Sequence, residues 1–319
     1  MLRYVLKRII WMIPIILGVT ILVFTMMTFC PGDPASIILG ASATDADLAV
    51  KRAELGLDDA YFVRLARYIS DVFFHFHMGS SWITGIDIGT TILERMPRTL
   101  TLAFVTLIIA YGLGIPLGII AAINQNKWQD SLSMLLALLG VAIPNFWLAL
   151  MLIIFFSVRL GWLPAMGFGG IQYYILPALS NCAGALANCA RQTRSSMLDV
   201  IRADYITTAR AKGVPERTVI TKHALKNALI PIITQLGNTL ARLLGGTMII
   251  ETIFSIPGMG DYIIGAVNNR DYPIVQGGTI VLAIVFSLTM LCIDLLYAAV
   301  DPRIKARYTG GAKRRKKVA

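Results

Sequence analysis

Long apolar runs constrain the fold of this chain more than any other feature. A helix needs about 20 consecutive apolar residues to cross a bilayer. Five stretches reach that length, at residues 9–29, 100–123, 131–158, 228–250 and 274–300. A sixth, 175–190, is shorter and rich in Ala, Asn and Cys, as is typical of a helix packed against other helices. Because 56% of the 319 residues are hydrophobic and only 15% are charged, we predict an all-α integral membrane protein with six transmembrane helices.

The basic residues gather in three places, and their distribution predicts an orientation. Net charge is +11, with Lys and Arg at the N-terminus (Arg3, Lys7, Arg8), in segment 191–226 and in the tail 301–319. Cytoplasmic loops of membrane proteins carry an excess of these residues, and six crossings put all three clusters on one side. We therefore predict a multi-pass protein of the cell membrane (inner or plasma) with both termini in the cytoplasm. A lipid-facing tail accounts for the charge without a nucleic-acid partner.

The segment between the first two predicted helices has the opposite charge balance. Residues 31–97 carry nine acids and five bases, which favours the external side. This segment is too long for a simple turn, and residues 45–57 and 59–76 have helical spacing. We predict a small folded external subdomain that can receive a partner protein. The chain then divides into 1–30 (N-terminal stub and first helix), 31–97 (external subdomain), 98–300 (membrane core, with a cytoplasmic loop at 191–227) and 301–319 (basic tail).

A polar, basic segment interrupts the apolar pattern between the fourth and fifth predicted helices. Residues 191–226 contain eight Lys or Arg and three acids. A helical run from Asp204 to Lys212 is expected to stop at Gly213, which accepts the positive φ of a helix end, and Pro215 then begins a second helix. Two short helices joined by a bend would fit a groove on another protein. The alternative is a basic loop that only sets the topology.

The sequence contains few groups suited to catalysis or to metal binding. It has no GxxxxGK[ST] phosphate loop, so any ATP must be bound elsewhere. The three histidines, His75, His77 and His223, do not form a catalytic or metal-binding cluster, because the first two would diverge on a helix. The four cysteines show no CxxC pairing and are expected to be small core residues. We predict a non-catalytic chain without a metal or cofactor of its own.

Several phrases, taken in order, resemble one family. They are TARAKGVPERTVITKHALKNALIP at 208–231, ETIFSIPGMG at 251–260, RDYPIVQGG at 270–278 and DLLYAAVDPRI at 294–304, preceded by MLRYVLKRI at the N-terminus and PGDP at 31–34. Together they are similar to the permease subunits of ABC importers for dipeptides, oligopeptides and nickel. The resemblance covers nearly the whole chain.

The resemblance implies that the basic segment is the loop that couples the permease to its ATPase. The family's general pattern (Glu-Ala-Ala, three residues, Gly, nine residues, Ile-x-Leu-Pro) opens here on Thr207, Thr208 and Ala209, has its glycine at Gly213, and closes on 223–226. Ala209, Gly213 and Leu225 keep the general residue types, and the departures are typical of the peptide and nickel branch. The expected coupling residues are Asp204, Thr207, Thr208, Ala209, Lys212, Gly213, His223, Leu225 and Lys226. Which of these side chains contact the ATPase stays open.

Partners and substrate are also implied by the resemblance. A homologous second permease, two ATP-binding subunits that hold ATP and Mg, and an extracytoplasmic solute-binding protein are expected. The phrases PNFWLA at 144–149, WLPAMGFGG at 162–170 and GGTMIIE at 245–251 are similar to nickel permeases. We therefore slightly favour nickel, free or chelated, with di- or oligopeptides as the alternative.

Polar residues in the fifth predicted helix are candidates for the translocation path. Gln235, Asn238 and Arg242 are spaced by three and four residues and share a helix face. They line a pore or form hydrogen bonds to the partner permease, and the sequence leaves both open. An ion-coupled secondary transporter is a remote alternative. It would show internal repeats and carboxylates at mid-membrane depth, and neither is apparent.

Overall fold

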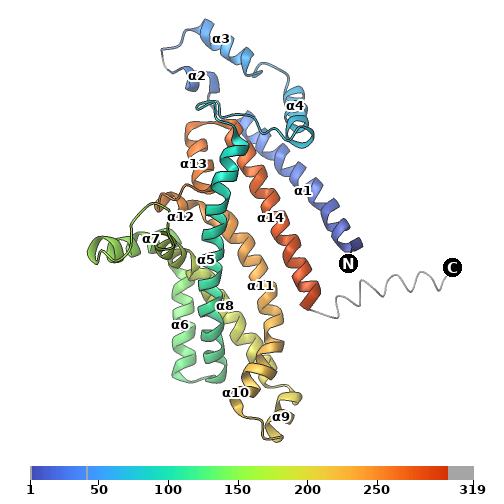
Figure 1. Cartoon of the computed structure of the whole chain (residues 1–319), viewed down its shortest axis with the longest axis vertical. Helices are drawn as coiled ribbons and strands as arrows, with labels where there is room; N and C mark the ends of the chain where they lie inside the picture. The colour runs from blue at the N-terminus through green and yellow to red at the C-terminus, as the bar shows by residue number, and fades with distance from the viewer. Residues whose placement is uncertain (1, 41, 301–319) are drawn as a thin grey trace, which may run out of the picture. The chain divides into compact units, whose positions relative to one another are not determined.

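Helices make up the regular structure of this chain (Figure 1). The computed structural model describes residues 2–40 and 42–300, and the predicted basic tail 301–319 lies outside them. Apart from one isolated β-bridge between Ser80 and Asp87, the regular elements of the described part are helical, which confirms the all-α class. The chain forms two compact units. Within the described residues, unit 1 comprises 2–6, 100–256 and 288–300, and unit 2 comprises 7–99 and 257–287.

Three single helices in the described part are long and apolar enough to cross a membrane. They are α1 (Leu2–Thr28), α5 (Ile88–Ile123) and α14 (Tyr272–Val300). These correspond to the predicted spans 9–29, 100–123 and 274–300. The helix α5 begins about three turns earlier than predicted, because its first residues include Glu94, Arg95 and Arg98 and so lack the apolar character used to identify a span.

The third predicted span is broken into two arms. Helix α6 (Trp128–Ala142) ends at Ile143, and α7 (Asn145–Leu152) continues into the π-helical stretch η1 (Ile153–Arg159), at 99° to α6. The break falls where Pro144 forces the preceding residue out of the helical region, and Ile143 has φ −82° and ψ 123°. These arms form a fourth apolar span only if the bent pair is taken as one.

Two further long helices lie at the predicted spans 175–190 and 228–250 and are less apolar than α1, α5 and α14. Helix α8 (Gln172–Ile201) has 30 residues and α11 (Leu225–Gly246) has 22. At 1.5 Å per residue they extend about 45 and 33 Å, enough to cross a hydrocarbon core of about 30 Å. The prediction of six spans requires both helices to cross, so the number six stays a prediction.

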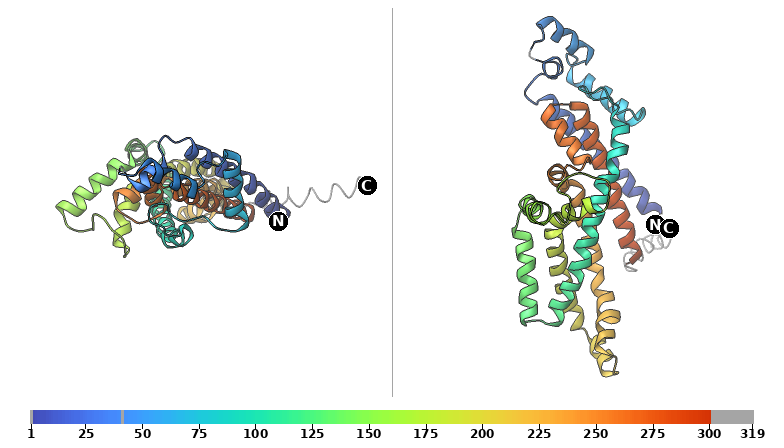
Figure 2. Two further views of the ribbon diagram at one scale, coloured as in Figure 1. Left: turned by 90° about the horizontal axis from the view of Figure 1, so that it is seen from above. Right: turned by 60° about the vertical axis from the view of Figure 1, so that its left-hand side comes forward.

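Unit 1 is built around α8, which packs against α6, α7 and α11. Figure 2 shows α6 and α8 running side by side. Glycines permit close approach of backbones. A Cβ added to Gly118 of α5 would lie 2.5 Å from the carbonyl oxygen of Ala190 and from the Cβ of Thr193, and one added to Gly140 of α6 would lie 3.1 Å from the Ala183 oxygen. Small residues at these positions therefore place α5 and α6 against α8.

A charged pair and an apolar cluster also join the elements of unit 1. Asp130, near the start of α6, accepts two hydrogen bonds from the Arg194 guanidinium, at 2.6 and 2.7 Å. An apolar cluster joins α5, α7, α8 and α12 (Met248–Ile253), with Leu102, Leu176 and Phe254 among its fully buried members. These contacts hold the helices of the unit in one arrangement.

Unit 2 contains the short helices predicted for the external segment. Helix α2 (Pro34–Leu39) is capped by Asp33, and α3 (Asp45–Glu54) begins with a capping box between Thr44 and Asp47. Helix α4 (Tyr61–Phe74) follows. The predicted helices 45–57 and 59–76 are thus confirmed, each with slightly narrower bounds. Val72 of α4 is buried with Ile16 of α1 and Ile280 of α14, so the unit has its own small core.

One helix of unit 2 was not predicted. Helix α13 (Met259–Asn269) lies in the stretch 255–272 that reads as a loop because it opens with Pro and Gly. It ends at Arg270, whose φ of 54° is left-handed, and the next residue, Asp271, is 2% exposed. The Asp271 carboxylate accepts hydrogen bonds from Ser81 Oγ at 2.5 Å and from the Trp82 backbone N–H at 3.1 Å. These bonds tie the end of α13 to the loop before α5.

Candidate functional site

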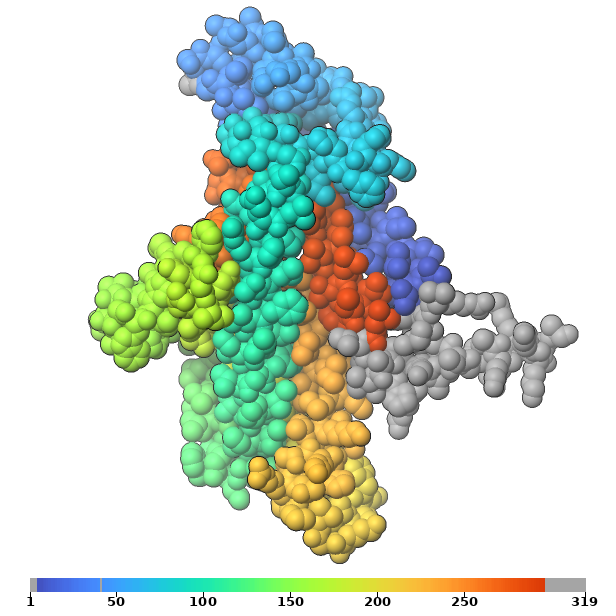
Figure 3. Space-filling view, viewed as in Figure 1, coloured from blue at the N-terminus to red at the C-terminus, as the bar shows by residue number. Residues whose placement is uncertain are grey.

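The basic segment folds as a helical hairpin at one end of unit 1. After α8, helix α9 (Asp204–Ala211) forms one arm, and α10 (Glu216–Thr218) with the π-helical stretch η2 (Val219–Ala224) forms the other. The second arm continues directly into α11. Figure 3 shows this hairpin in yellow as the projecting tip of the unit. The predicted sequence of helix, bend and helix is therefore present, and the second helix is the beginning of a long one.

Gly213 makes the bend with a left-handed backbone. Its φ is 76°, as predicted for a helix end. The Gly213 N–H donates to the Arg210 oxygen at 2.9 Å, and the Val214 N–H donates to the Ala209 oxygen at 3.3 Å. This pair of bonds is the Schellman arrangement, in which the residue after the turn also packs against the last turn of the helix. Val214 and Ala209 belong to one apolar cluster, so the turn is fixed both by hydrogen bonds and by packing.

The inner face of the hairpin is apolar and packs onto the long helices. Ile206 of α9 and Val219 of η2 are fully buried, together with Met197 of α8 and Ala228 of α11. Ile119 and Ala122, at the end of α5, belong to the same cluster. A force applied to the hairpin would therefore reach three long helices through packed side chains, because close-packed interiors deform little.

Polar contacts on the outer side close the hairpin. The Arg210 guanidinium donates to both carboxylate oxygens of Glu216, at 2.6 and 3.1 Å, across the bend. This contact lowers the pKa of Glu216 below its ordinary value, because the hydrogen bonds and the nearby positive charge favour the ionised form. Asn227 Nδ2 of α11 donates to the Tyr205 hydroxyl of α9 at 2.8 Å, which joins the first arm to the long helix.

The predicted coupling residues divide into two groups by exposure. Those whose side chains or backbone lie on the surface are Asp204, Thr207, Thr208, Lys212, Gly213, His223 and Lys226. Ala209 is buried and Leu225 is half-buried, and both pack within the hairpin cluster. The exposed group can meet a partner protein, whereas the buried pair determines the shape that the partner would meet.

Contributions from Arg210, Glu216 and Tyr205 were not predicted from the sequence. The signal for the ion pair was present, since opposite charges flank a Gly-x-Pro turn. The contact between Tyr205 and Asn227 had no such signal, because the two residues are 22 positions apart. Tyr205 is 45% exposed, so it also contributes an aromatic ring to the outer surface.

The three pore candidates on α11 differ in exposure. Asn238 and Arg242 are exposed and lie on one face with Pro231 and Thr234. Gln235 is half-buried, and its Oε1 atom is buried without a hydrogen-bond partner among the described residues. The face that Asn238 and Arg242 share is available to a pore or to a second subunit, and Gln235 lies at the edge of that face, where its side chain is partly covered by packing.

Two family descriptions match the chain and together span most of it. Residues 114–306 match the binding-protein-dependent transport system inner membrane component, and residues 1–103 match the N-terminal part of that membrane component.

Relatives of similar length are named as transport permeases. A glutathione transport system permease protein of Salmonella paratyphi A is 42% identical over 305 residues, covering 96% of this chain and 99% of the relative. A dipeptide transport system permease protein of Alkalihalophilus pseudofirmus is 41% identical over 333 residues, covering 96% and 100%. A putative peptide transport system permease protein of Brucella abortus is 40% identical over 309 residues, covering 94% and 98%.

The fold is also similar to a solved structure. The inward-facing MetNI methionine ABC transporter matches with a TM-score of 0.56 and 20% identity, covering 66% of this chain and 96% of the matched chain. At this identity the similarity concerns the fold alone.

Proposed function

Since the chain belongs to the binding-protein-dependent transport system inner membrane components, we propose that it is the permease subunit of an ATP-driven importer of short peptides. Membership in the ABC importer permeases follows from the family. The peptide substrate is the proposal, and the names of the relatives carry it. Those relatives serve glutathione and dipeptide systems and align over nearly their full length. This favours the peptide alternative over the nickel substrate that the phrases at 144–149, 162–170 and 245–251 suggested.

In the proposed mechanism the hairpin at Gly213 couples ATP hydrolysis to transport. The partner ATPase subunits would hold ATP and Mg and would bind the exposed residues of α9 and the bend. Closure of those subunits would move the hairpin as one body, because Ile206 and Val219 pack it onto α5, α8 and α11. A rigid contact of this kind can convert closure of one subunit into a tilt of membrane helices.

The remaining partners follow the same reasoning. A homologous permease would complete the pore, with Asn238 and Arg242 of α11 on the exposed face that meets either the path or the second permease. A solute-binding protein would deliver the peptide from outside, on the side where the charge pattern puts residues 31–97. We infer that this chain performs no chemistry itself and that both of its termini are cytoplasmic.

Reconstitution of the complete complex in liposomes tests the proposal. Uptake of a labelled dipeptide, of glutathione and of nickel would be measured with and without ATP, at matched concentrations of the binding protein. We expect ATP-dependent accumulation of a peptide. Nickel uptake without peptide uptake would contradict the substrate, and peptide uptake without the ATPase subunits would contradict the importer class.

A further inference from the structure

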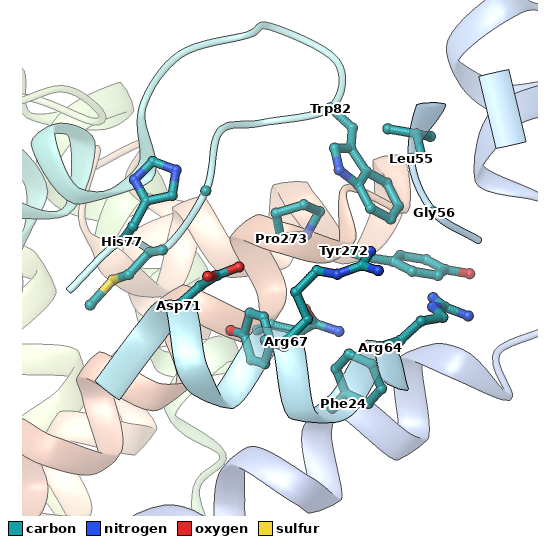
Figure 4. Close-up of a pocket in the computed structure, with 14 residues that line it drawn as sticks. Phe24, Leu55, Gly56, Arg64, Arg67, Asp71, His77, Trp82, Tyr272 and Pro273 are labelled. Atoms are coloured by element: carbon teal, nitrogen blue, oxygen red, sulfur yellow. The ribbon is translucent and has the colours of Figure 1, made fainter. Parts of the chain in front are cut away.

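Unit 2 contains a cavity of about 230 Å³ that the coupling mechanism does not use. Residues of α1, α4, the loop before α5 and the start of α14 line it (Figure 4). In Figure 4 the side chains of Asp71, Arg67 and Arg64 follow one another along α4, and Trp82 and Tyr272 lie across from them. The cavity thus has charged groups of both signs on one side and aromatic rings on the other.

Arg64 is the cation of the cavity whose charge has no carboxylate partner. No ion pair joins it to an acid within the described residues. Its hydrogen bond to the Leu57 oxygen is long, at 3.4 Å, and its guanidinium carbon lies 5.8 Å from the centre of the Phe24 ring. Burial lowers the pKa of Arg64, although an arginine stays charged at neutral pH. The carboxylates of Asp59 and Asp58 act on Arg64 from farther away, so its guanidinium can still donate directly to an incoming anion.

Arg67, one turn along α4, provides a contrast. Its Nη2 atom lies 2.7 Å from the Asp59 carboxylate, so its charge is already compensated. A Cβ added to Gly56 would lie 2.9 Å from Nη1 of Arg67, so the glycine leaves room for the side chain. The two arginines share a cavity, and of the two only Arg67 is in direct contact with a carboxylate of the described residues, which leaves the guanidinium of Arg64 for a ligand.

Acidic and amide groups stand at other points of the cavity wall. Asp71 has a contact of 3.7 Å with His75 Nδ1, which is an ion pair only when the histidine is protonated. The Asp71 side chain is 48% exposed and makes no shorter contact with the described residues, so its carboxylate can accept from an ammonium group. Gln276 lines the cavity, is 8% exposed and makes no hydrogen bond with the described residues. Its side-chain amide can donate to and accept from a polar ligand atom.

The aromatic wall suits an apolar side chain of the ligand. The ring centres of Trp82 and Tyr272 are 5.5 Å apart, and Trp82 is fixed by the bond from its N–H to Asp271. Phe24 contributes a third ring next to Arg64. A rigid apolar surface next to a few placed polar groups is the usual composition of a small-molecule site.

We propose that this cavity binds the carboxylate end of a free di- or tripeptide. Arg64 donates to the carboxylate, Asp71 accepts from the amino group, and a side chain of the peptide packs on Trp82 and Tyr272. The two charged residues are seven positions apart on α4, about 10 Å along the helix axis, which an extended chain of two to three residues spans at about 3.5 Å per residue. The volume is below the roughly 300 to 1,000 Å³ of drug-sized sites, in keeping with so small a ligand. This inference rests on the proposed peptide substrate.

Direct binding to the full chain in lipid nanodiscs tests the site. Calorimetric titration with alanyl-alanyl-leucine is compared with titration of its C-terminal amide. We expect the amide to bind at least tenfold more weakly to the unchanged protein, because it lacks the carboxylate that Arg64 recognises. This comparison requires no variant to fold. Equal binding of acid and amide would overturn the proposal.

Three substitutions sharpen the test. Arg64→Gln should weaken binding of the acid at least tenfold and leave binding of the amide unchanged. Arg67→Gln should change the affinity for the acid less than threefold, since the charge of Arg67 is already compensated by Asp59. Lys51→Gln, which removes a charge on α3 outside the cavity, should have no effect. Thermal unfolding of each variant checks that it is folded, and a folded Arg64→Gln protein that binds normally would contradict the assignment.

The test also separates this inference from the proposed function. If the reconstituted importer accumulates the tripeptide but the nanodisc protein does not bind it, the cavity proposal fails and the function stands. If the nanodisc protein binds the tripeptide but the importer does not accumulate it, the proposed function fails. The nanodisc protein is also titrated with the solute-binding protein. If the Arg64→Gln substitution weakens binding of that protein while no free peptide binds at all, the site is a docking surface and the proposal is wrong.

Discussion

Arg210 and Glu216 form a two-point ion pair across the turn at Gly213, at 2.6 and 3.1 Å. The pair lies on the outer side of the hairpin, while Ala209 and Val214 pack on the inner side. The turn is therefore held from both sides. This arrangement gives the hairpin a defined shape before any partner is bound, and it leads to the first two predictions.

The ion pair predicts a pH dependence of hairpin stability. Because Arg210 lowers the pKa of Glu216 below its ordinary 4.5, the pair stabilises the hairpin above about pH 4.5, and this contribution is lost as the pH falls through the lowered value. An exposed pair contributes at most about 1 kcal/mol. We compare amide hydrogen exchange of residues 204–218 in the unchanged protein and in Glu216→Gln at each pH. The ratio of the two exchange rates, unchanged protein over variant, should rise up to about fivefold as the pH falls. A constant ratio between the two proteins would contradict the prediction.

The left-handed turn predicts that bulk and backbone conformation at Gly213 have different effects. A Cβ added there meets nothing within 4 Å, so only the backbone resists substitution. Gly213→Val should strain the turn by about 1 to 2 kcal/mol, and ATP-driven uptake should fall severalfold while the complex still assembles. Gly213→Asn is the matched control, because Asn tolerates positive φ. If both variants transport normally, the hairpin is not the coupling element.

The pair between Asp130 and Arg194 predicts strong coupling between α6 and α8. The Asp130 side chain is 6% exposed and that of Arg194 is 26% exposed. Asp130→Leu should lower stability by about 2 kcal/mol, because it leaves a partly buried guanidinium without its partner. The double variant with Arg194→Leu should recover part of that loss. Thermal unfolding in detergent is measured for the unchanged protein, the two single variants and the double variant. If the stability losses of the single variants add up to that of the double variant, the pair does not act as a unit.

Two glycines of α5 should respond in opposite ways to alanine. At Gly118 the added methyl group would overlap the backbone oxygen of Ala190, which cannot move aside cheaply. We expect Gly118→Ala to destabilise by about 1 to 3 kcal/mol. At Gly112 nothing lies within 4 Å, so Gly112→Ala should be neutral or stabilising by up to about 1 kcal/mol. Unfolding temperatures of the two purified variants provide the comparison, and similar shifts would contradict the packing of α5 on α8.

The exposed face of α11 predicts a difference between Arg242 and Gln235. Arg242→Gln should reduce peptide uptake by the assembled importer without lowering the unfolding temperature of the isolated chain, because the side chain is exposed. Gln235→Leu should leave uptake within about twofold, since it replaces a buried amide whose oxygen has no partner. Uptake at saturating and limiting peptide, together with thermal unfolding, checks both variants. The reverse pattern would contradict a role for Arg242 in the path.

Features with a local physical cause were predicted correctly. The apolar runs indicated α1, α5 and α14, since transfer into lipid depends on composition within a short window. The helical spacing of 45–57 and 59–76 indicated α3 and α4. The turn at Gly213 followed from its place between a helical run and Pro215. In each case the determining residues are neighbours in the sequence.

Other features depend on residues far apart and were not predicted. The helix α13 was masked by the Pro and Gly at its start, although Asp271 at its end is held by Ser81 and Trp82. The burial of Gln235 followed from packing around α11 and not from its spacing with Asn238 and Arg242. The cavity around Arg64 joins α1, α4 and α14, and no local pattern relates these segments.

The sequence by itself determined that this chain enters a membrane, that its basic segment bends at a glycine, and which family it belongs to. These properties are carried by runs of neighbouring residues and by phrases in a fixed order. Only the tertiary structure decided that the hairpin packs onto three long helices, that Arg67 forms an ion pair while Arg64 does not, and that Gln235 is half-buried while Asn238 and Arg242 beside it are exposed. Those outcomes depend on which side chains meet across distant segments, and such meetings are set by packing of the whole unit.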